Sequence, residues 1–164
     1  MNRSSAALGS VLFLVVAPGT LAGLIPWWFT GWRMGEAPTL QRIAGGVLIA
    51  LGFALLVECF GRFVVQGRGT PAPLAPPDRL VVTGAYRRVR NPMYVAVVAM
   101  ILGQAALFAD LRLLGYAALV WLGFHLWVLA YEEPTLRRSF PTDYARFVAA
   151  VPRWIPRLIP WRGG

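Results

Sequence analysis

The sequence has 164 residues, of which 57% are hydrophobic and only 14% are charged, a balance far more apolar than that of an ordinary soluble domain. Its net charge of +9 comes from sixteen basic residues, all of them arginine. These arginines lie at the ends of apolar runs and form no separate basic domain or tail, so the composition predicts a membrane protein and argues against nucleic-acid binding.

Four apolar segments approach the length of about 20 residues that a helix needs to cross the hydrocarbon core. We expect spans at residues 6–28, 43–65, 93–108 and 111–131. The first segment resembles a secretory signal, because Arg3 precedes it and it meets Pro18 and Gly19, but the apolar run continues to Trp28, which favours a span. The predicted fold class is therefore all-α, with one multi-pass membrane domain over residues 1–164.

The arginines also predict how the spans are oriented. They are dense in the loop 66–92 and in the tail 132–164, whereas the other two connections between spans carry few. Both termini, the loop and the tail are therefore expected on the cytoplasmic side of an inner membrane or endomembrane. The prolines of the loop predict a stiff strap. The tail, in which arginines and aromatic residues are interrupted by prolines, predicts short helices at the headgroup level.

Almost nothing joins the last two spans, so we expect an antiparallel hairpin whose free ends lie side by side. The residues before the hairpin read YRRVRNPMY (86–94), and those after it read YEEP (131–134). Asn91 as N-cap and Pro92 favour a helix start. Arg90 destabilises that positive helix end unless an anion, such as a carboxylate or phosphate, docks there.

The two adjacent glutamates after the hairpin need separate explanations. Glu133 is expected in the N-cap region of a short helix that begins at Pro134, where negative charge is favourable. Glu132 has two interpretations. It forms an ion pair with Arg87 or Arg137, or its carboxylate points at the hydroxyls or positive charge of a ligand between the hairpin ends.

Polar residues inside the spans give further candidates. Glu58, Arg62 and Gln66 share one helix face, which predicts a Glu58–Arg62 ion pair and leaves Gln66 as a ligand contact. His125 lies on roughly the same helix face as Glu132 and is either hydrogen-bonded to another helix or catalytic. No Cys pair or His cluster has metal-ligand spacing, so no metal site is predicted.

The runs LVVTGAYRRVRNPMY (80–94) and EEPTLRRSFPTDYARF (132–147) resemble the integral-membrane methyltransferases typified by isoprenylcysteine carboxyl methyltransferase and phosphatidylethanolamine N-methyltransferase. The resemblance implies that S-adenosylmethionine binds at the cytoplasmic ends of the hairpin, under the tail, and that a lipophilic acceptor enters from the bilayer. It implies cofactor contacts from Gln66, Asp78, Arg79, Leu80, Val81, Tyr86, Asn91, Pro92, Met93, Tyr94 and Glu132.

The candidate catalytic residues are Arg90, Glu132 and His125. An amine acceptor must first lose a proton, for which His125 and Glu58 are the candidates. The acceptor is an isoprenylcysteine-like carboxylate or a phospholipid amine. Val128 stands where the carboxyl methyltransferases place an arginine, whereas NPMY and YEEP resemble the phospholipid enzyme. The residues expected to hold a lipid phosphate are Arg137, Arg138 and Arg153.

Two other classes remain open at this point. A membrane reductase of the sterol-reductase type has a related C-terminal architecture and uses a nicotinamide cofactor. A four-span transporter or assembly protein without catalysis would line a pathway with the charged residues of its spans. The expected partners are membrane lipids or a lipidated acceptor, with no obligate protein partner, metal or nucleic acid.

Overall fold

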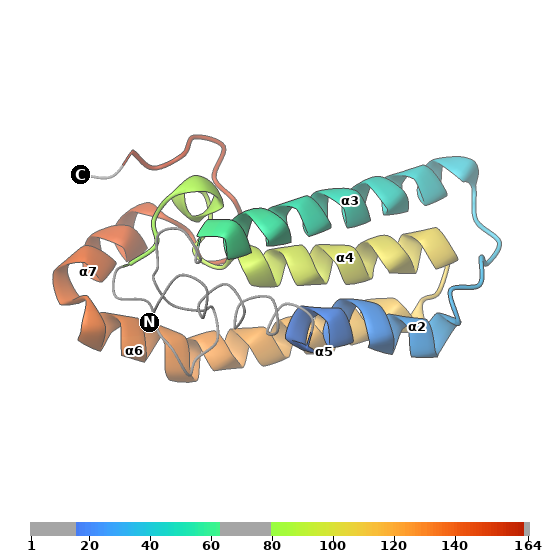
Figure 1. Ribbon diagram of the computed structural model, residues 1–164, viewed down its shortest axis with the longest axis horizontal. Coiled ribbons are helices and arrows are strands. Elements are labelled where there is room, and N and C mark those ends of the chain that lie inside the picture. Colours follow the sequence, from blue (N-terminus) through green and yellow to red (C-terminus); the bar gives the residue numbers. More distant parts are fainter. Residues whose placement is uncertain (1–15, 63–79, 163–164) are drawn as a thin grey trace.

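The structure, a computed structural model, describes residues 16–62 and 80–162. This part of the chain is all-helical and contains no strand, which agrees with the predicted fold class. Its main helices are α2 (Ile25–Thr30), α3 (Thr39–Arg62), α4 (Pro92–Phe108), α5 (Arg112–Trp127), α6 (Glu133–Ser139) and α7 (Pro141–Ala150). Figure 1 shows α3, α4 and α5 along one common direction, with α6, α7 and the C-terminal segment at one end and the α2–α3 connection at the other.

Within residues 16–62 and 80–162, two helical runs are long and apolar enough to cross a membrane: α3, with 24 residues, and Arg112–Ser139, with 28. They correspond to the second and fourth predicted spans. α4 is apolar but has 17 residues, a length of about 26 Å at the helical rise. The first predicted span lies partly outside the described residues, and its described end is helical from residue 16 to Thr30. The count of four spans and the cytoplasmic orientation stay predictions.

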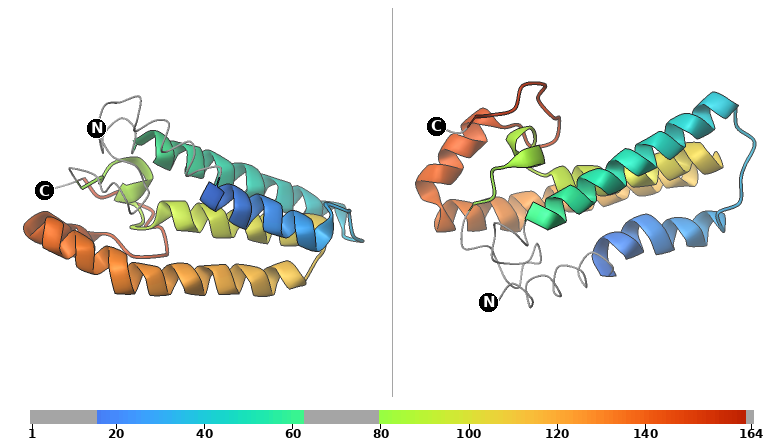
Figure 2. Two further views of the ribbon diagram at one scale, coloured as in Figure 1. Left: turned by 60° about the horizontal axis from the view of Figure 1, so that its bottom comes forward. Right: turned by 45° about the horizontal axis from the view of Figure 1, so that its top comes forward.

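Helices α4 and α5 form the predicted hairpin. Phe108 ends α4, and Ala109, with a φ of 55°, closes it by donating its N–H to the Ala105 carbonyl. The Asp110 carboxylate accepts hydrogen bonds from the backbone N–H of Arg112 at 3.0 Å and from its guanidinium at 2.9 Å, which holds the turn. Figure 2 shows that the far end of α5 therefore returns to the start of α4.

Two π-helical segments accommodate prolines inside the long helices. η1 (Thr20–Leu24) and η4 (Val128–Glu132) each end two residues before a proline, Pro26 and Pro134. A proline in a regular helix leaves a carbonyl unpaired and its ring clashes with that carbonyl. Here the residue before each proline donates its N–H five residues back, which widens the turn. The last span was predicted to end at residue 131, but this turn lets the helical path continue to Ser139.

The hairpin satisfies the carbonyls that the first π segment sets free. Gln104 Nε2 donates to the Ala22 carbonyl at 2.7 Å, and the Tyr116 hydroxyl donates to the Leu21 carbonyl at 2.9 Å. In a regular helix the Ala22 carbonyl would accept from residue 26, which is proline. Because apolar surroundings offer no water to such groups, these two side chains fix the N-terminal helix against α4 and α5.

Helix α3 packs on α4 through facing glycines. A Cβ atom on Gly45 would lie 2.6 Å from the Gly103 carbonyl oxygen, and one on Gly103 would lie 2.8 Å from the Gly45 carbonyl oxygen. Gly52 approaches the Ala96 carbonyl oxygen in the same way, at 2.9 Å. Small residues at such positions let two membrane helices come into close backbone contact.

We expect Gly45→Ala to destabilise the protein by about 1–3 kcal/mol, because the added methyl group overlaps backbone atoms that cannot rotate away. Gly46→Ala is the matched control, since a Cβ there meets nothing within 4 Å. Alanine is a better helix former than glycine by about 0.5–1 kcal/mol, so thermal unfolding in detergent should shift in opposite directions for these neighbours. Shifts of the same sign and size would contradict the close approach of α3 and α4.

Candidate active site

The hairpin brings Tyr94 and Glu132 into direct contact. Tyr94 lies in the first turn of α4, Glu132 is the last residue of η4, and the Tyr94 hydroxyl donates a hydrogen bond to Glu132 Oε1. The Tyr94 ring also stacks on Phe124 of α5, with ring centroids 4.3 Å apart. The two ends of the predicted site, 38 residues apart in the sequence, therefore form one place.

Beside this contact lies a hollow of about 110 Å³ that opens to the surface. Burial raises the pKa of Tyr86 well above its ordinary value, so this part of the wall stays uncharged. Pro92 is buried and does not line the hollow, and Gln66, Asp78 and Arg79 lie outside the described residues. The lining residues are Leu80, Val81, Tyr86, Arg90, Asn91, Met93, Tyr94, Glu132, Leu136 and Phe147.

Two lining residues, Leu136 and Phe147, were not predicted. Leu136 lies on α6, and Phe147 lies on α7 and is 3% exposed. Both pack in a small apolar cluster with Tyr144 and Val151. Their sequence signal is that of ordinary core residues at helical spacing, so only the fold of α6 and α7 reveals that they also close the hollow.

Glu132 has no arginine partner in the described parts of the chain. Its Oε1 accepts both of its hydrogen bonds, from the Tyr94 hydroxyl and from Trp127 Nε1 at 3.2 Å. No described residue donates to its Oε2. The predicted alternative of an ion pair with Arg87 or Arg137 is therefore wrong. A carboxylate in this position attracts positive charge and hydrogen-bond donors.

Glu133 makes the ion pairs instead. Its side chain is 7% exposed and lies 3.0 Å from Arg90, 2.6 Å from Arg153 and 3.5 Å from Arg137. Arg153 binds both carboxylate oxygens, and this pairing raises the pKa of its guanidinium above the ordinary value. Glu133 is the first residue of α6, but the helical path runs into it from η4 and its N–H donates to the Val128 carbonyl, so the prediction that a separate short helix begins here is wrong. Its three ion pairs were not predicted.

Arg90 is held by Glu133 but keeps one donor unpaired. Its side chain is 10% exposed, and its Nη1 donates to Glu133 Oε1 at 3.0 Å. Its Nε is buried without a hydrogen-bond partner among the described residues. Such a donor costs stability unless a ligand satisfies it. Because Arg90 lines the hollow, the arrangement fits an anionic group there.

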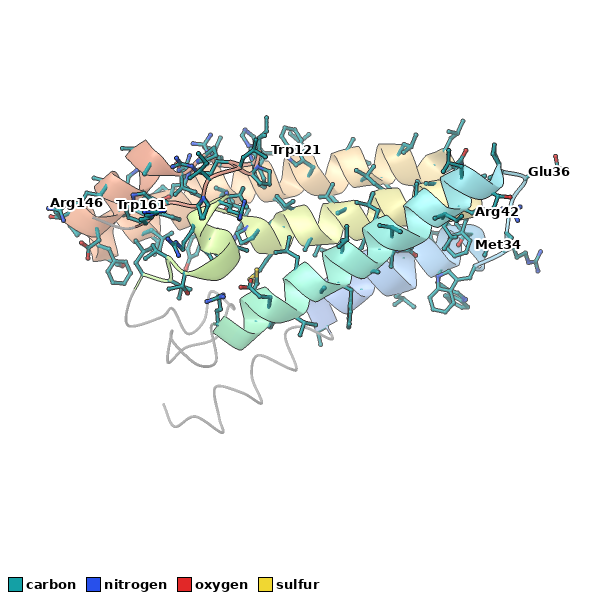
Figure 3. All side chains as sticks on the ribbon, turned by 90° about the horizontal axis from the view of Figure 1, so that it is seen from above. Met34, Glu36, Arg42, Trp121, Arg146 and Trp161 are labelled. Carbon is teal, nitrogen blue, oxygen red and sulfur yellow. The ribbon has the colours of Figure 1, made fainter. Side chains whose placement is uncertain are left out.

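The C-terminal segment is tied along the residues that precede α4. Asn91 stands at the predicted helix start, but its side chain does not cap the helix and donates to the Arg153 carbonyl at 3.1 Å. Figure 3 shows Trp161 near this end of the molecule and Met34 and Glu36 at the opposite end. Three backbone hydrogen bonds join the segments, from Arg90 to Pro152 at 2.9 Å, from Arg157 to Arg88 at 2.9 Å and from Trp161 to Arg87 at 2.8 Å.

His125 does not line the hollow. Its Nδ1 accepts a hydrogen bond from Trp154 Nε1 at 3.0 Å, and its ring stacks on Trp121 with centroids 5.2 Å apart. The sequence predicted a hydrogen bond to another helix, whereas Trp154 lies in the irregular C-terminal segment, so the histidine is hydrogen-bonded but not to a helix. Its catalytic role stays a prediction.

The predicted ion pair between Glu58 and Arg62 is confirmed. It lies directly against Gly84, which has a φ of 55° and no room for a side chain. Arg62 also donates to the Thr83 hydroxyl at 3.0 Å. The pair thus joins the end of α3 to the turn that leads into the hollow.

The three arginines predicted to bind a lipid phosphate differ in accessibility. Arg153 is engaged by Glu133 and is 30% exposed. Arg137 is 64% exposed, and Arg138 is exposed as well. Contact with a phosphate stays a prediction for all three.

A hairpin of apolar helices whose joined ends hold a mostly apolar hollow, with an arginine and a glutamate in its wall, is a candidate small-molecule site at one end of the helices. Residues 40–143 match the family model described as phospholipid methyltransferase. This stretch covers more than half of the chain and contains α3, the hairpin and most of both motifs. The chain belongs to the phospholipid methyltransferase family.

Two curated relatives match a shorter stretch. The chain is 32% identical over 86 residues to the cobalt-zinc-cadmium resistance protein CzcN of Cupriavidus metallidurans, which covers 52% of this chain and 39% of that protein. It is 35% identical over 85 residues to the nickel-cobalt-cadmium resistance protein NccN of Alcaligenes xylosoxydans xylosoxydans, which covers 51% and 38%. The match thus spans less than half of either relative. No solved structure matches the chain.

Proposed function

We propose that the protein transfers a methyl group from S-adenosylmethionine to the amine of a membrane phospholipid. One observation carries this proposal. Among the residues that the structure describes, the hollow combines the Glu132 carboxylate, which has no cationic partner there, with the guanidinium of Arg90, whose buried Nε has no acceptor there. A ligand that carries both charges complements both groups. The family match favours methyl transfer over nicotinamide-dependent reduction and over transport without catalysis.

The residues of the hollow fit this cofactor. The guanidinium of Arg90 would attract its carboxylate, the rings of Tyr94 and Phe147 would offer faces to its positive charge, and Glu132 would supply the negative charge beside the reacting atoms. When bound, S-adenosylmethionine supplies a methyl group that is attached to a positively charged sulfur, and the sulfur is the leaving group, which departs as a neutral thioether. The apolar side chains of the wall, among them Met93 and Leu136, exclude water from the reacting groups.

An amine acceptor suits this site better than a carboxylate acceptor. Glu132 repels a second carboxylate, and buried Val128, 1% exposed, offers no positive charge at the position of the arginine in the carboxyl methyltransferases. A lipid ammonium must lose a proton before its nitrogen attacks, and Glu132 Oε2, to which no described residue donates, could accept that proton. His125 and Glu58, the other residues predicted to accept this proton, are engaged in hydrogen bonds elsewhere.

Ligand binding and label transfer test the two halves of the proposal. A ligand at about 100 times its Kd stabilises a protein by about 2.7 kcal/mol, so S-adenosylmethionine or S-adenosylhomocysteine should raise the unfolding temperature in detergent, and reduced nicotinamides should not. With a methyl-labelled donor, label should enter phosphatidylethanolamine. Label found in a farnesylated cysteine carboxylate would contradict the phospholipid amine as methyl acceptor but would still support S-adenosylmethionine as the cofactor. No stabilisation by either adenosyl compound would overturn the cofactor.

A further inference from the structure

Two aromatic side chains stand on the outer face of the long helix next to the site. Trp127 is 43% exposed and Tyr131 is 40% exposed, and their rings stack with centroids 4.7 Å apart. Both belong to the run Arg112–Ser139, which is long and apolar enough to cross a membrane. In a bilayer this face meets lipid, near one end of the span.

Trp127 also reaches the carboxylate of the hollow. Its Nε1 donates to Glu132 Oε1 at 3.2 Å, and the same oxygen accepts from the Tyr94 hydroxyl. Tyr94 lines the hollow, whereas Trp127 does not. The carboxylate therefore has one neighbour that lines the hollow, Tyr94, and one that is partly exposed on the outer face of the helix, Trp127.

Exposure to lipid does not by itself require this hydrogen bond. Trp121 projects from the same helix (Figure 3) and is 40% exposed, close to the value for Trp127. Its rings contact His125 and Trp154 and not the residues of the hollow. Tryptophan is common at membrane interfaces as an anchor. The comparison shows that an anchor on this helix needs no contact with Glu132.

We propose that Trp127 and Tyr131 form the subsite through which the ammonium headgroup of the lipid acceptor reaches Glu132, with Trp127 as the specificity-determining residue. This inference rests on the proposed function. An ammonium group is attracted to the faces of indole and phenol rings. Its N–H groups replace the indole N–H at Glu132, so the site exchanges one donor for another and leaves no carboxylate unpaired. A headgroup without an N–H donor, such as glycerol phosphate with hydroxyls only, gains neither the charge nor the ring contact.

Binding of short-chain lipids tests the subsite without turnover. Dihexanoyl phosphatidylethanolamine and dihexanoyl phosphatidylglycerol are titrated into detergent-solubilised wild type, Trp127→Leu, Trp127→Phe and the matched control Trp121→Leu. We expect Trp127→Leu to bind the ethanolamine lipid about tenfold more weakly and the glycerol lipid unchanged, because it loses the ring face. Trp127→Phe keeps a ring and removes the competing N–H, so it should bind the ethanolamine lipid at least as tightly as wild type. Trp121→Leu should match wild type with both lipids.

Calorimetry with S-adenosylhomocysteine separates this inference from the proposed function. Equal cofactor affinity in all four proteins, together with a selective loss in Trp127→Leu, supports the subsite. Equal cofactor affinity with equal lipid preference in Trp127→Leu and Trp121→Leu overturns the subsite and keeps the proposed function. Loss of cofactor binding in Trp127→Leu assigns Trp127 to the hollow itself and overturns the inference. Absence of cofactor binding in wild type overturns the proposed function and the inference together.

Discussion

A Glu132→Gln protein is expected to lose about 100-fold or more in methyl transfer, while it unfolds at the same temperature as wild type or at a higher one. Glutamine keeps the shape of the side chain, and its carbonyl oxygen can accept the same hydrogen bonds from Tyr94 and Trp127. What disappears is the negative charge. A hydrogen bond to a charged group contributes about 1.5–3 kcal/mol, and removing a preorganised charge at the reacting atoms typically lowers kcat by about 10²–10³.

Stability should not fall, because the folded protein compensates the charge of Glu132 poorly. No arginine of the described residues pairs with this carboxylate. Withdrawing a charge from water without a partner is unfavourable, and a neutral amide of the same shape avoids that cost. Opposite effects on stability and activity are typical of a residue kept for its function.

The measurement needs thermal unfolding without ligand and label transfer on the same preparation. Glu36→Gln is the control, since Glu36 is exposed at the opposite end of the molecule (Figure 3) and its loss should change neither quantity. A fall of several degrees in the unfolding temperature of Glu132→Gln, with activity retained, would instead give Glu132 a structural role.

The meeting of Tyr94 and Glu132 was predictable from the sequence alone. It follows from the lengths of two apolar runs and from the short turn between Phe108 and Arg112, because a chain that crosses and immediately recrosses must bring its ends together. The Glu58–Arg62 pair was predictable for a similar reason, since residues four apart share a helix face. Both predictions depend only on regular helical geometry.

The separate roles of Glu132 and Glu133 were not predictable in this way. Neighbouring residues on a helix point about 100° apart, so their directions depend on the phase of the helix. The π segment η4 lies immediately before them and changes that phase by its wider turn. Sequence periodicity assumes a constant turn, and it therefore could not tell which carboxylate faces the hollow and which faces the arginines.

The path of the C-terminal segment was also beyond the sequence. Its contacts to the residues before α4 are backbone hydrogen bonds between irregular segments, such as that from Arg90 to the Pro152 carbonyl. Such bonds carry no side-chain signature. The partner of Arg153 was missed for the same reason, because only this path brings it beside Glu133.

Glu133→Gln is expected to have the opposite effect on stability from its neighbour, a loss of about 3–5 kcal/mol. Glu133 compensates Arg90 and Arg153, whose side chains are 10% and 30% exposed. An amide of the same shape leaves both guanidiniums near one another without a negative charge. Breaking a buried ion pair from one side costs more than the pair contributes, because the remaining charge stays out of water.

The damage should be concentrated where the C-terminal segment meets the hollow. Arg153 binds the Glu133 carboxylate and so holds this segment in place. Loss of that carboxylate should therefore expose the arginines of the segment to trypsin. Limited proteolysis should therefore cut Glu133→Gln near Arg153 and Arg157 before global unfolding, and S-adenosylhomocysteine should bind more weakly because Arg90 is no longer positioned. Arg137→Gln is the stability control, since this partner is 64% exposed at 3.5 Å and exposed pairs contribute about 0–1 kcal/mol. Equal unfolding temperatures and equal cutting rates for the two variants would show that Glu133 does not organise this end of the molecule.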